Sequence, residues 1–234
     1  YKYLSTVQVI ALQSALKYQA MQKWAIDFGF KSSLALNLPN YTYQSNMPSA
    51  TEKDQIPTLE TALYGDNKFN LPYGFQLNAG LRFVNFSTIG FTDFALEPRI
   101  SMNRELNSNH QLNLSYMRAN QFSHLLFTPG SLMSNEVWIP ADKTIKPAAS
   151  DQYTIGWTGS FGDGSYQSEV SLYYKTLNNL ATYKEGFSNL KGDNNWRSKV
   201  ETGGKGEAYG LEVLFRKNNG NWTGFASYSW SKAT

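Results

Sequence analysis

Two consecutive stretches of alternating polar and apolar residues, between residues 150 and 177, form the clearest pattern in the chain. Each stretch keeps this alternation for about ten residues, which is the period of a β-strand. Gly162-Asp163-Gly164-Ser165 separates them and has the residues of a tight hairpin turn. The apolar face of this predicted hairpin carries Tyr153, Ile155, Trp157, Phe161, Val170, Leu172 and Tyr174. The other face is polar, so the hairpin fits either a soluble sheet with one wet face or a pair of membrane-spanning barrel strands.

The same alternation recurs along most of the chain and predicts about ten strands. The predicted strands cover residues 12–19, 24–31, 58–64, 75–83, 94–103, 111–116, 150–161, 166–177, 208–217 and 222–231. A helix is the competing prediction for residues 7–21, because Ala, Leu and Gln favour helices, but the alternation there favours a strand. Pro98 cannot donate a hydrogen bond to a neighbouring strand, so we expect a bulge at that position.

The connections between the predicted strands alternate in length. Residues 38–57, 121–149 and 178–205 have the composition of long loops, residues 87–92 that of a loop of medium length, and the other connections are short. Membrane barrels sort their connections in this way, with short turns at one end and long loops at the other. The sequence therefore predicts an all-β fold, an antiparallel up-and-down meander of about ten strands that is part of a transmembrane β-barrel. A soluble β-sandwich that binds carbohydrate through its aromatic side chains stays open as the alternative.

Composition favours a strand-rich protein and excludes several classes of function. Aromatic residues make up 15% of the 234 residues and charged residues only 17%, against about a quarter in typical domains. The net charge of +3 and the scattered Lys and Arg residues argue against a nucleic-acid partner. The chain has no cysteine, which excludes disulfides and a thiol nucleophile, and no apolar run of about 18 residues that predicts a membrane helix. It starts at Tyr1 without a signal peptide, so we expect a mature or truncated piece.

Several short segments resemble the barrel portion of TonB-dependent outer-membrane receptors, most closely those of Bacteroidetes-type bacteria. The segments are Leu96–Arg99, Trp138–Pro140, Lys146-Pro147, Gln152-Tyr153, Tyr173–Lys175, Asn178–Leu180, Gly206–Glu212 and Tyr228–Ser231. The resemblance implies a barrel of about 22 antiparallel strands, an N-terminal plug inside it, and import of a scarce nutrient driven by the TonB complex. We expect residues 1–234 to be one incomplete barrel segment, with the plug and the closing strands absent from it.

The sequence offers few candidates for chemistry. We expect His110 in a turn and His124 in a surface loop, and neither has a partner at metal-ligand spacing. The glycines around Tyr209 lack the spacing and the following helix of a phosphate-binding loop. Glu97 and Arg99 lie two residues apart on one strand face, which suits acid–base chemistry or, as we favour, a charge network that faces the barrel lumen.

The long loops carry the best candidates for ligand binding, because aromatic rings and arginine bind ligands by stacking and charge-assisted hydrogen bonds. These candidates are Phe122, His124, Trp138, Tyr183, Phe187, Trp196 and Arg197. The alternative is that these loops pack on one another over the barrel mouth.

Together these features predict a transport receptor in the Gram-negative outer membrane rather than an enzyme. The expected partners are outer-membrane lipid, a nutrient such as a siderophore, vitamin, oligosaccharide or peptide, and the TonB complex through the absent plug. We expect no cofactor, no metal and no nucleic acid.

Overall fold

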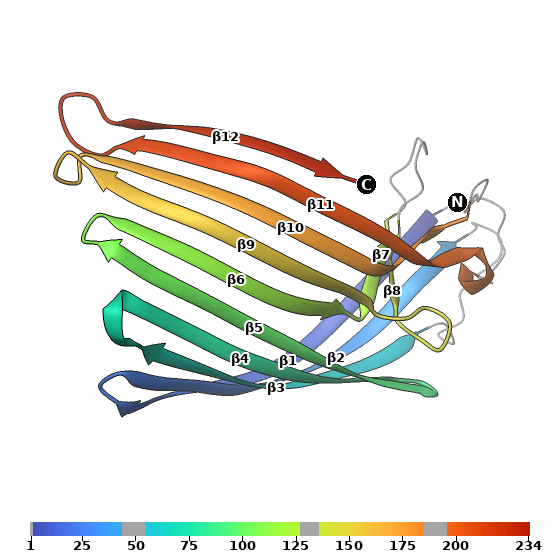
Figure 1. The fold of residues 1–234 in the computed structure, drawn as a ribbon. Helices are drawn as coiled ribbons and strands as arrows, with labels where there is room; N and C mark the ends of the chain where they lie inside the picture. The colour runs from blue at the N-terminus through green and yellow to red at the C-terminus, as the bar shows by residue number, and fades with distance from the viewer. Residues whose placement is uncertain (1, 44–54, 127–135, 185–195) are drawn as a thin grey trace.

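One antiparallel sheet of ten strands forms most of the molecule and curves into an open trough (Figure 1). The structure, a computed structural model, describes residues 2–43, 55–126, 136–184 and 196–234. The strand order is β1-β2-β3-β4-β5-β6-β9-β10-β11-β12, and β7 pairs with β8 in a separate two-stranded sheet. All neighbouring strands are antiparallel, which confirms the predicted up-and-down meander.

The elements have the following bounds: β1 (Lys2–Met21), β2 (Trp24–Tyr43), β3 (Ile56–Asn70), β4 (Phe75–Thr88), β5 (Phe91–Asn107), β6 (His110–Gln121), β7 (Ser123–Leu126), β8 (Val137–Pro140), β9 (Ala148–Phe161), β10 (Tyr166–Tyr183), β11 (Val200–Lys217), β12 (Gly224–Ala233), and the short 3-10 helices η2 (Pro72–Gly74) and η4 (Trp196–Lys199). None of the helices in the described residues is long and apolar enough to cross a membrane.

Most strands are longer than their alternating patterns predict. The competing helix over residues 7–21 is wrong, since β1 pairs with β2 along nearly its whole length. The loop expected over residues 38–57 is shorter, because β2 continues through Pro39 and β3 already contains Pro57. The ladder between β3 and β4 begins only at Thr58, so the missing N–H of Pro57 interrupts nothing on that side.

Pro98 ends a ladder instead of forming a bulge, so the predicted bulge is wrong. The register between β4 and β5 runs without a shift from Phe75↔Arg104 to Thr88↔Phe91. The ladder between β5 and β6, however, stops at Arg99↔Met117. A proline has no backbone N–H to offer the strand on that side, and β5 and β6 therefore separate toward one end of the sheet.

The connections fall at two opposite ends of the trough. Short turns join β1 to β2, β3 to β4, β5 to β6, β9 to β10 and β11 to β12 at one end, here called the turn end (Figure 1). The long connections gather at the other, the loop end. One connection differs from expectation: β4 and β5 are joined there by the two residues Ile89 and Gly90 alone, where we predicted a loop of medium length.

Side chains on the outer, convex face form apolar rows across the strands. One row, aligned by register, consists of Phe69, Leu77, Met102, Leu114, Ile155, Leu172, Leu211 and Trp230. The next row toward the loop end contains Tyr116, Tyr153, Tyr174 and Tyr209. On β9 the outward side chains stay apolar from Tyr153 to Phe161, about the nine to eleven residues that a tilted strand needs to cross a membrane.

This outer face also decides between the barrel and the soluble sandwich. A sandwich requires a second sheet over Tyr153, Ile155 and Leu172, but these side chains remain 52%, 51% and 49% exposed. No such second layer exists among the described residues, where the only other sheet is the small β7–β8 hairpin. The sandwich alternative is therefore wrong.

The inner, concave face is covered near the loop end by the segment between β6 and β9. This segment, residues 122–147, contains the β7–β8 hairpin, which contacts β10 on one side of the trough and β1 and β2 on the other. Figure 1 shows the hairpin lying across the trough. We expected an irregular external loop here. Burial explains the difference, because Leu126, Val137 and Ile139 lose almost all contact with solvent in this position.

Candidate functional site

Ion pairs line the concave face of β2 to β5. Arg82 on β4 donates to Glu60 on β3 at 3.0 Å and to Glu97 on β5 at 2.7 Å. Glu97 is only 7% exposed, and a carboxylate so far from water needs charged or hydrogen-bonding partners. Lys68 and Asp27 form a further pair at 2.6 Å. Ion pairs therefore connect the four neighbouring strands β2 to β5, and we call this concave surface the charged wall.

Arg99 and Asp66 form a bidentate pair that crosses an intervening strand. Two guanidinium nitrogens of Arg99 on β5 each lie 2.5 Å from a carboxylate oxygen of Asp66 on β3. Gly80 of β4 lies between them in the register, and a Cβ there would overlap the Asp66 carboxylate. The Arg99 guanidinium also lies over the ring of Tyr64, 5.6 Å from its centroid. The glycine is thus required for the bridge.

Glu97 links this wall to the inserted segment. Its carboxylate accepts a hydrogen bond of 2.7 Å from the backbone N–H of Asn120, next to the point where Pro98 ends the β5–β6 ladder. A side chain thus supplies an acceptor where β5 and β6 no longer pair. Asn120 lies two residues before Phe122, so Glu97 holds the start of the segment against β5.

The first inserted residues pack in a small apolar cluster on β3 to β5. Phe122 stacks on Phe86 with ring centroids 4.8 Å apart, and the N–H of Ala141 donates to the carbonyl oxygen of Phe122 at 2.7 Å. Ala62 and Val84 complete the cluster from the sheet. Its members are almost fully buried, which fixes Phe122 at the start of the segment, and Ala141 further along it, to the inner wall.

The β7–β8 hairpin packs in a second cluster near β10 and β11. Its buried members are Leu126, Val137, Ile139, Ile145, Tyr183 and Val200. His124 on β7 is 5% exposed, and its Nε2 lies 3.0 Å from the carbonyl oxygen of Lys146. Burial lowers the pKa of His124 below its usual value, although the hydrogen bond to Lys146 opposes this. The expectation of a surface histidine at position 124 is therefore wrong.

The other histidine also lies within a strand. His110 begins β6, where its ring stacks on Trp157 at 5.6 Å between centroids, so the expected turn position is off by one residue. Among the described residues, no three His, Asp or Glu side chains come together as a metal-binding group.

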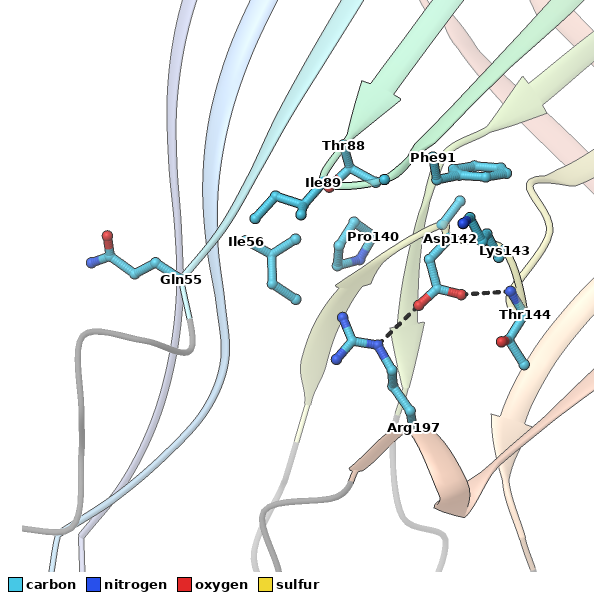
Figure 2. Close-up of a pocket in the computed structure, with 12 residues that line it drawn as sticks. Gln55, Ile56, Thr88, Ile89, Phe91, Pro140, Asp142, Lys143, Thr144 and Arg197 are labelled. Carbon is cyan, nitrogen blue, oxygen red and sulfur yellow. Dashed lines mark hydrogen bonds and ion pairs between the residues drawn. The ribbon is translucent and has the colours of Figure 1, made fainter.

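A cavity of about 460 Å³ opens between the inserted segment and the loop-end edge of the sheet (Figure 2). It is lined by Gln55, Ile56, Thr88, Ile89, Gly90, Phe91, Pro140, Ala141, Asp142, Lys143, Thr144 and Arg197. The two-residue turn at Ile89 and Gly90 keeps β4 and β5 short enough to form one side of it. We call this cavity the mouth pocket.

Asp142 organises the charged side of the mouth pocket. Its carboxylate accepts hydrogen bonds from the backbone N–H groups of Thr144 and Ile145 at 2.8 and 2.9 Å, and from Nε of Arg197 at 3.0 Å. Figure 2 shows Arg197 and Thr144 meeting this carboxylate from opposite sides. Burial alone would raise the pKa of Asp142, but the three hydrogen bonds outweigh it and hold the pKa below its usual value. The pocket therefore presents ionised groups of both signs.

The structure separates the predicted ligand-binding residues. Phe122 and Tyr183 are buried in the two clusters and His124 is buried on β7, so all three have little surface to offer a ligand in this arrangement. Trp138 on β8 is 41% exposed, and Arg197 lines the mouth pocket.

Two of the candidates are not described in full. Phe187 lies outside the described residues, and Trp196 begins η4 with its side chain outside the described part. The sequence reasoning missed Asp142, although Asp142-Lys143-Thr144 has the residues of a turn in which Asp bonds the backbone two residues on.

The geometry is that of a β-barrel wall with an inserted loop, and a family comparison agrees. The family described as "TonB dependent receptor-like, beta-barrel" matches residues 3–234. The chain belongs to the TonB-dependent receptor family. Its strands form part of the barrel domain of such a receptor, and the Gram-negative outer membrane is where this family resides. The closer likeness to Bacteroidetes-type receptors stays a prediction.

Solved receptor structures share the fold of this chain at low sequence identity. The FrpB iron transporter from Neisseria meningitidis (F3-3 variant) superposes with a TM-score of 0.71 at 15% identity, over 97% of this chain and 35% of that one. The siderophore receptor PirA from Pseudomonas aeruginosa gives 0.70 at 16%, over 97% and 43%. The pyoverdine outer membrane receptor FpvA from Pseudomonas aeruginosa PAO1, bound to pyoverdine, gives 0.66 at 17%, over 99% and 36%. The chain thus spans 35% to 43% of the length of these receptors. No curated protein matches it in sequence.

Proposed function

We propose that this receptor segment is part of an active importer that captures a scarce nutrient at the loop end of the barrel. The observation that carries the proposal is the mouth pocket, which the inserted segment forms on a wall of the receptor fold. Energy would come from the TonB complex, through a plug that lies outside residues 1–234. The relatives are receptors and transporters, and we propose that this protein likewise carries out no catalysis.

A siderophore is the first nutrient class to test. Two of the solved structures with the same fold are named as siderophore or pyoverdine receptors, and a third as an iron transporter. A vitamin, an oligosaccharide and a peptide remain the other classes. We propose that Arg197 in the mouth pocket and Trp138 on β8 outside it contact the ligand, because both keep exposed surface. Arg197 would act through charge-assisted hydrogen bonds.

Uptake by cells that carry the intact receptor tests this function. Cells with and without the gene are supplied with a panel of radiolabelled ferric siderophores, cobalamin and labelled oligosaccharides. We expect uptake of one class that requires the gene and stops when the TonB complex is inactivated. Arg197→Ala should reduce this uptake about tenfold or more, the loss typical of a charged hydrogen bond.

Arg216→Ala is the matched control, because Arg216 lies on β11 near the turn end. It should leave uptake unchanged, and a heat-modifiable band on gels should show equal amounts of folded receptor for both variants. Gene-dependent uptake that persists without the TonB complex would contradict active import. Loss of uptake in the Arg216 variant alone would contradict the mouth pocket as the site.

A further inference from the structure

Two cationic side chains lie over aromatic rings on the outer face, at the turn end of their strands. The guanidinium carbon of Arg104 on β5 is 4.8 Å from the ring centroid of Phe75, the first residue of β4. The ammonium nitrogen of Lys217, the last residue of β11, is 5.9 Å from the ring centroid of Tyr166, the first residue of β10. Both pairs therefore mark the edge where the short turns lie (Figure 1).

Neither cation has a carboxylate partner among the described residues, where the ion pairs involve other side chains. The outer face offers a direct contrast at its loop end. There Arg118 on β6 lies 3.7 Å from Asp151 on β9, and Asp151 also accepts a hydrogen bond of 2.8 Å from Tyr116. On the outer face of the described residues, Arg118 near the loop end thus has a carboxylate partner, whereas Arg104 and Lys217 at the turn end have none.

Aromatic rings continue the turn-end rim between the two cations. The ring of His110 lies between Trp157 and Phe161, with centroids 5.6 and 5.3 Å away, and Tyr166 stacks on Phe215 at 5.9 Å. The apolar rows of the outer face begin next to this rim, on its loop-end side. Aromatic rings and long cationic side chains at such a boundary place their polar ends at the level of lipid headgroups.

We infer that this rim binds the phosphate groups of anionic glycerophospholipids in the membrane leaflet at the turn end. The phosphate oxygens would supply the negative charge that the protein does not place beside Arg104 and Lys217. The rings beneath these cations hold them at the headgroup level, and the water that the rings displace there strengthens the attraction of each cation to a phosphate. Each cation near a membrane surface favours an anionic lipid by roughly fivefold. The inference rests on membership in the barrel family and is independent of the proposed nutrient.

Competition between two lipids tests the rim. The intact receptor is reconstituted in nanodiscs with equal amounts of phosphatidylglycerol and phosphatidylcholine, released gently, and its retained lipids are quantified by native mass spectrometry. We expect phosphatidylglycerol to be enriched about fivefold at each cation. Arg104→Gln and Lys217→Gln should each remove part of this enrichment, and the double variant should bring the ratio close to one.

Arg118→Gln serves as the control, because it removes an outer-face arginine that already has a carboxylate partner. It should leave the ratio unchanged, and all variants should keep the heat-modifiable band of a folded barrel. Equal retention of the two lipids by the unmodified receptor would overturn the inference. So would enrichment that survives the double variant, or enrichment that Arg118→Gln removes as strongly. Preferential retention of added lipopolysaccharide in place of phosphatidylglycerol would also overturn it.

Discussion

The inner face of β2 to β5 and the inner face of β9 to β11 have the same strand geometry but different chemistry. The first carries four inter-strand ion pairs, centred on Arg82 and Arg99. The described residues of the second form hydrogen bonds in which at most one partner is charged, such as the bond of 2.9 Å that Gln167 donates to Glu169. The inserted segment begins on the charged wall, where Glu97 holds Asn120.

This difference shows where the barrel wall needs internal support. The charged wall is partly covered by the Phe122 cluster, and charges that lose water are stable only when paired. The wall that positions the mouth pocket is thus the one with the most specific contacts.

Substitution of an outer-face residue tests whether the β9–β11 wall presents an apolar outer surface to lipid. Leu172→Arg, or Val213→Arg in the neighbouring strand, should reduce the free energy of unfolding by about 2–4 kcal/mol in lipid vesicles. Ser171→Arg is the matched control, because its side chain faces the water-filled side of β10. Urea unfolding followed by the heat-modifiable gel shift measures the effect, and equal losses for Leu172→Arg and Ser171→Arg would contradict the assignment of faces.

A methyl group added at Gly80 tests the importance of the charged wall. In Gly80→Ala the new Cβ overlaps the Asp66 carboxylate and separates it from Arg99. We expect a loss of about 1–3 kcal/mol in the free energy of unfolding, as for other overpacked sites. Gly156→Ala on the β9 wall is the control, since its Cβ would meet only atoms at 3.7 and 3.8 Å. If both variants unfold at the same urea concentration, the two walls do not differ as proposed.

Removal of the Glu97 carboxylate tests the link between the wall and the inserted segment. Glu97→Ala should raise amide hydrogen exchange over residues 120–126, equivalent to about 1–2 kcal/mol of local stability, because Asn120 and Arg82 lose an acceptor. Glu97→Gln keeps an acceptor oxygen and should restore part of the protection. Glu169→Ala on the opposite wall should not change these amides. Unchanged exchange in Glu97→Ala would show that the segment does not depend on this contact.

Acidification should destabilise the β7–β8 cluster before it destabilises the Phe122 cluster. We expect this to be the smallest of the four effects on stability. Burial lowers the pKa of His124 in the folded state below its unfolded value near 6.5, so the neutral form is the one that packs. Its contribution to stability is complete above about pH 6.5 and is lost as the pH falls through the lowered folded pKa. The protection factors of the β7 and β8 amides, taken against the intrinsic exchange rate at each pH, should therefore fall in this range, and those at Phe122 and Ala141 should fall less.

His124→Phe is the variant that isolates this effect, because it keeps a ring in the cluster and cannot be protonated. The protection factors at β7 and β8 should then no longer change with pH below about 6.5. If the pH dependence persists in His124→Phe, another group controls the hairpin.

The fold could be predicted from sequence because a strand with one apolar and one polar face has a local signature of period two. That signature located the strands that contain Tyr153, Leu172 and Val213, and the alternation of loop lengths indicated a barrel. It failed where the local pattern is weak. β2 and β3 continue past Pro39 and Pro57 because neighbouring strands supply the hydrogen bonds, and this information lies elsewhere in the chain.

The candidate site could be predicted only in part for a related reason. Aromatic and arginine residues in long loops were recognised, but sequence does not tell whether such a residue points outward or packs inward. Phe122 and Tyr183 find apolar partners on distant strands and become buried, whereas Arg197 finds Asp142 and lines a cavity. Phe122 and its partner Phe86 are 36 residues apart in sequence, and Arg197 and Asp142 are 55 apart. The curvature of the sheet brings such distant residues into contact.

By itself, the sequence determined the class of the protein: an antiparallel barrel wall with a lipid-facing and a water-facing side. Alternating hydrophobicity is sufficient for that, since each strand has one face toward lipid and the other toward water. Only the tertiary structure decided that residues 122–147 turn into the trough and that Gly80 lets Asp66 reach Arg99. It alone decided that Arg104 and Lys217 of the turn-end rim have no carboxylate partner in the part of the chain that the structure describes. These features depend on which side chains the curved sheet brings together, and no local pattern encodes that.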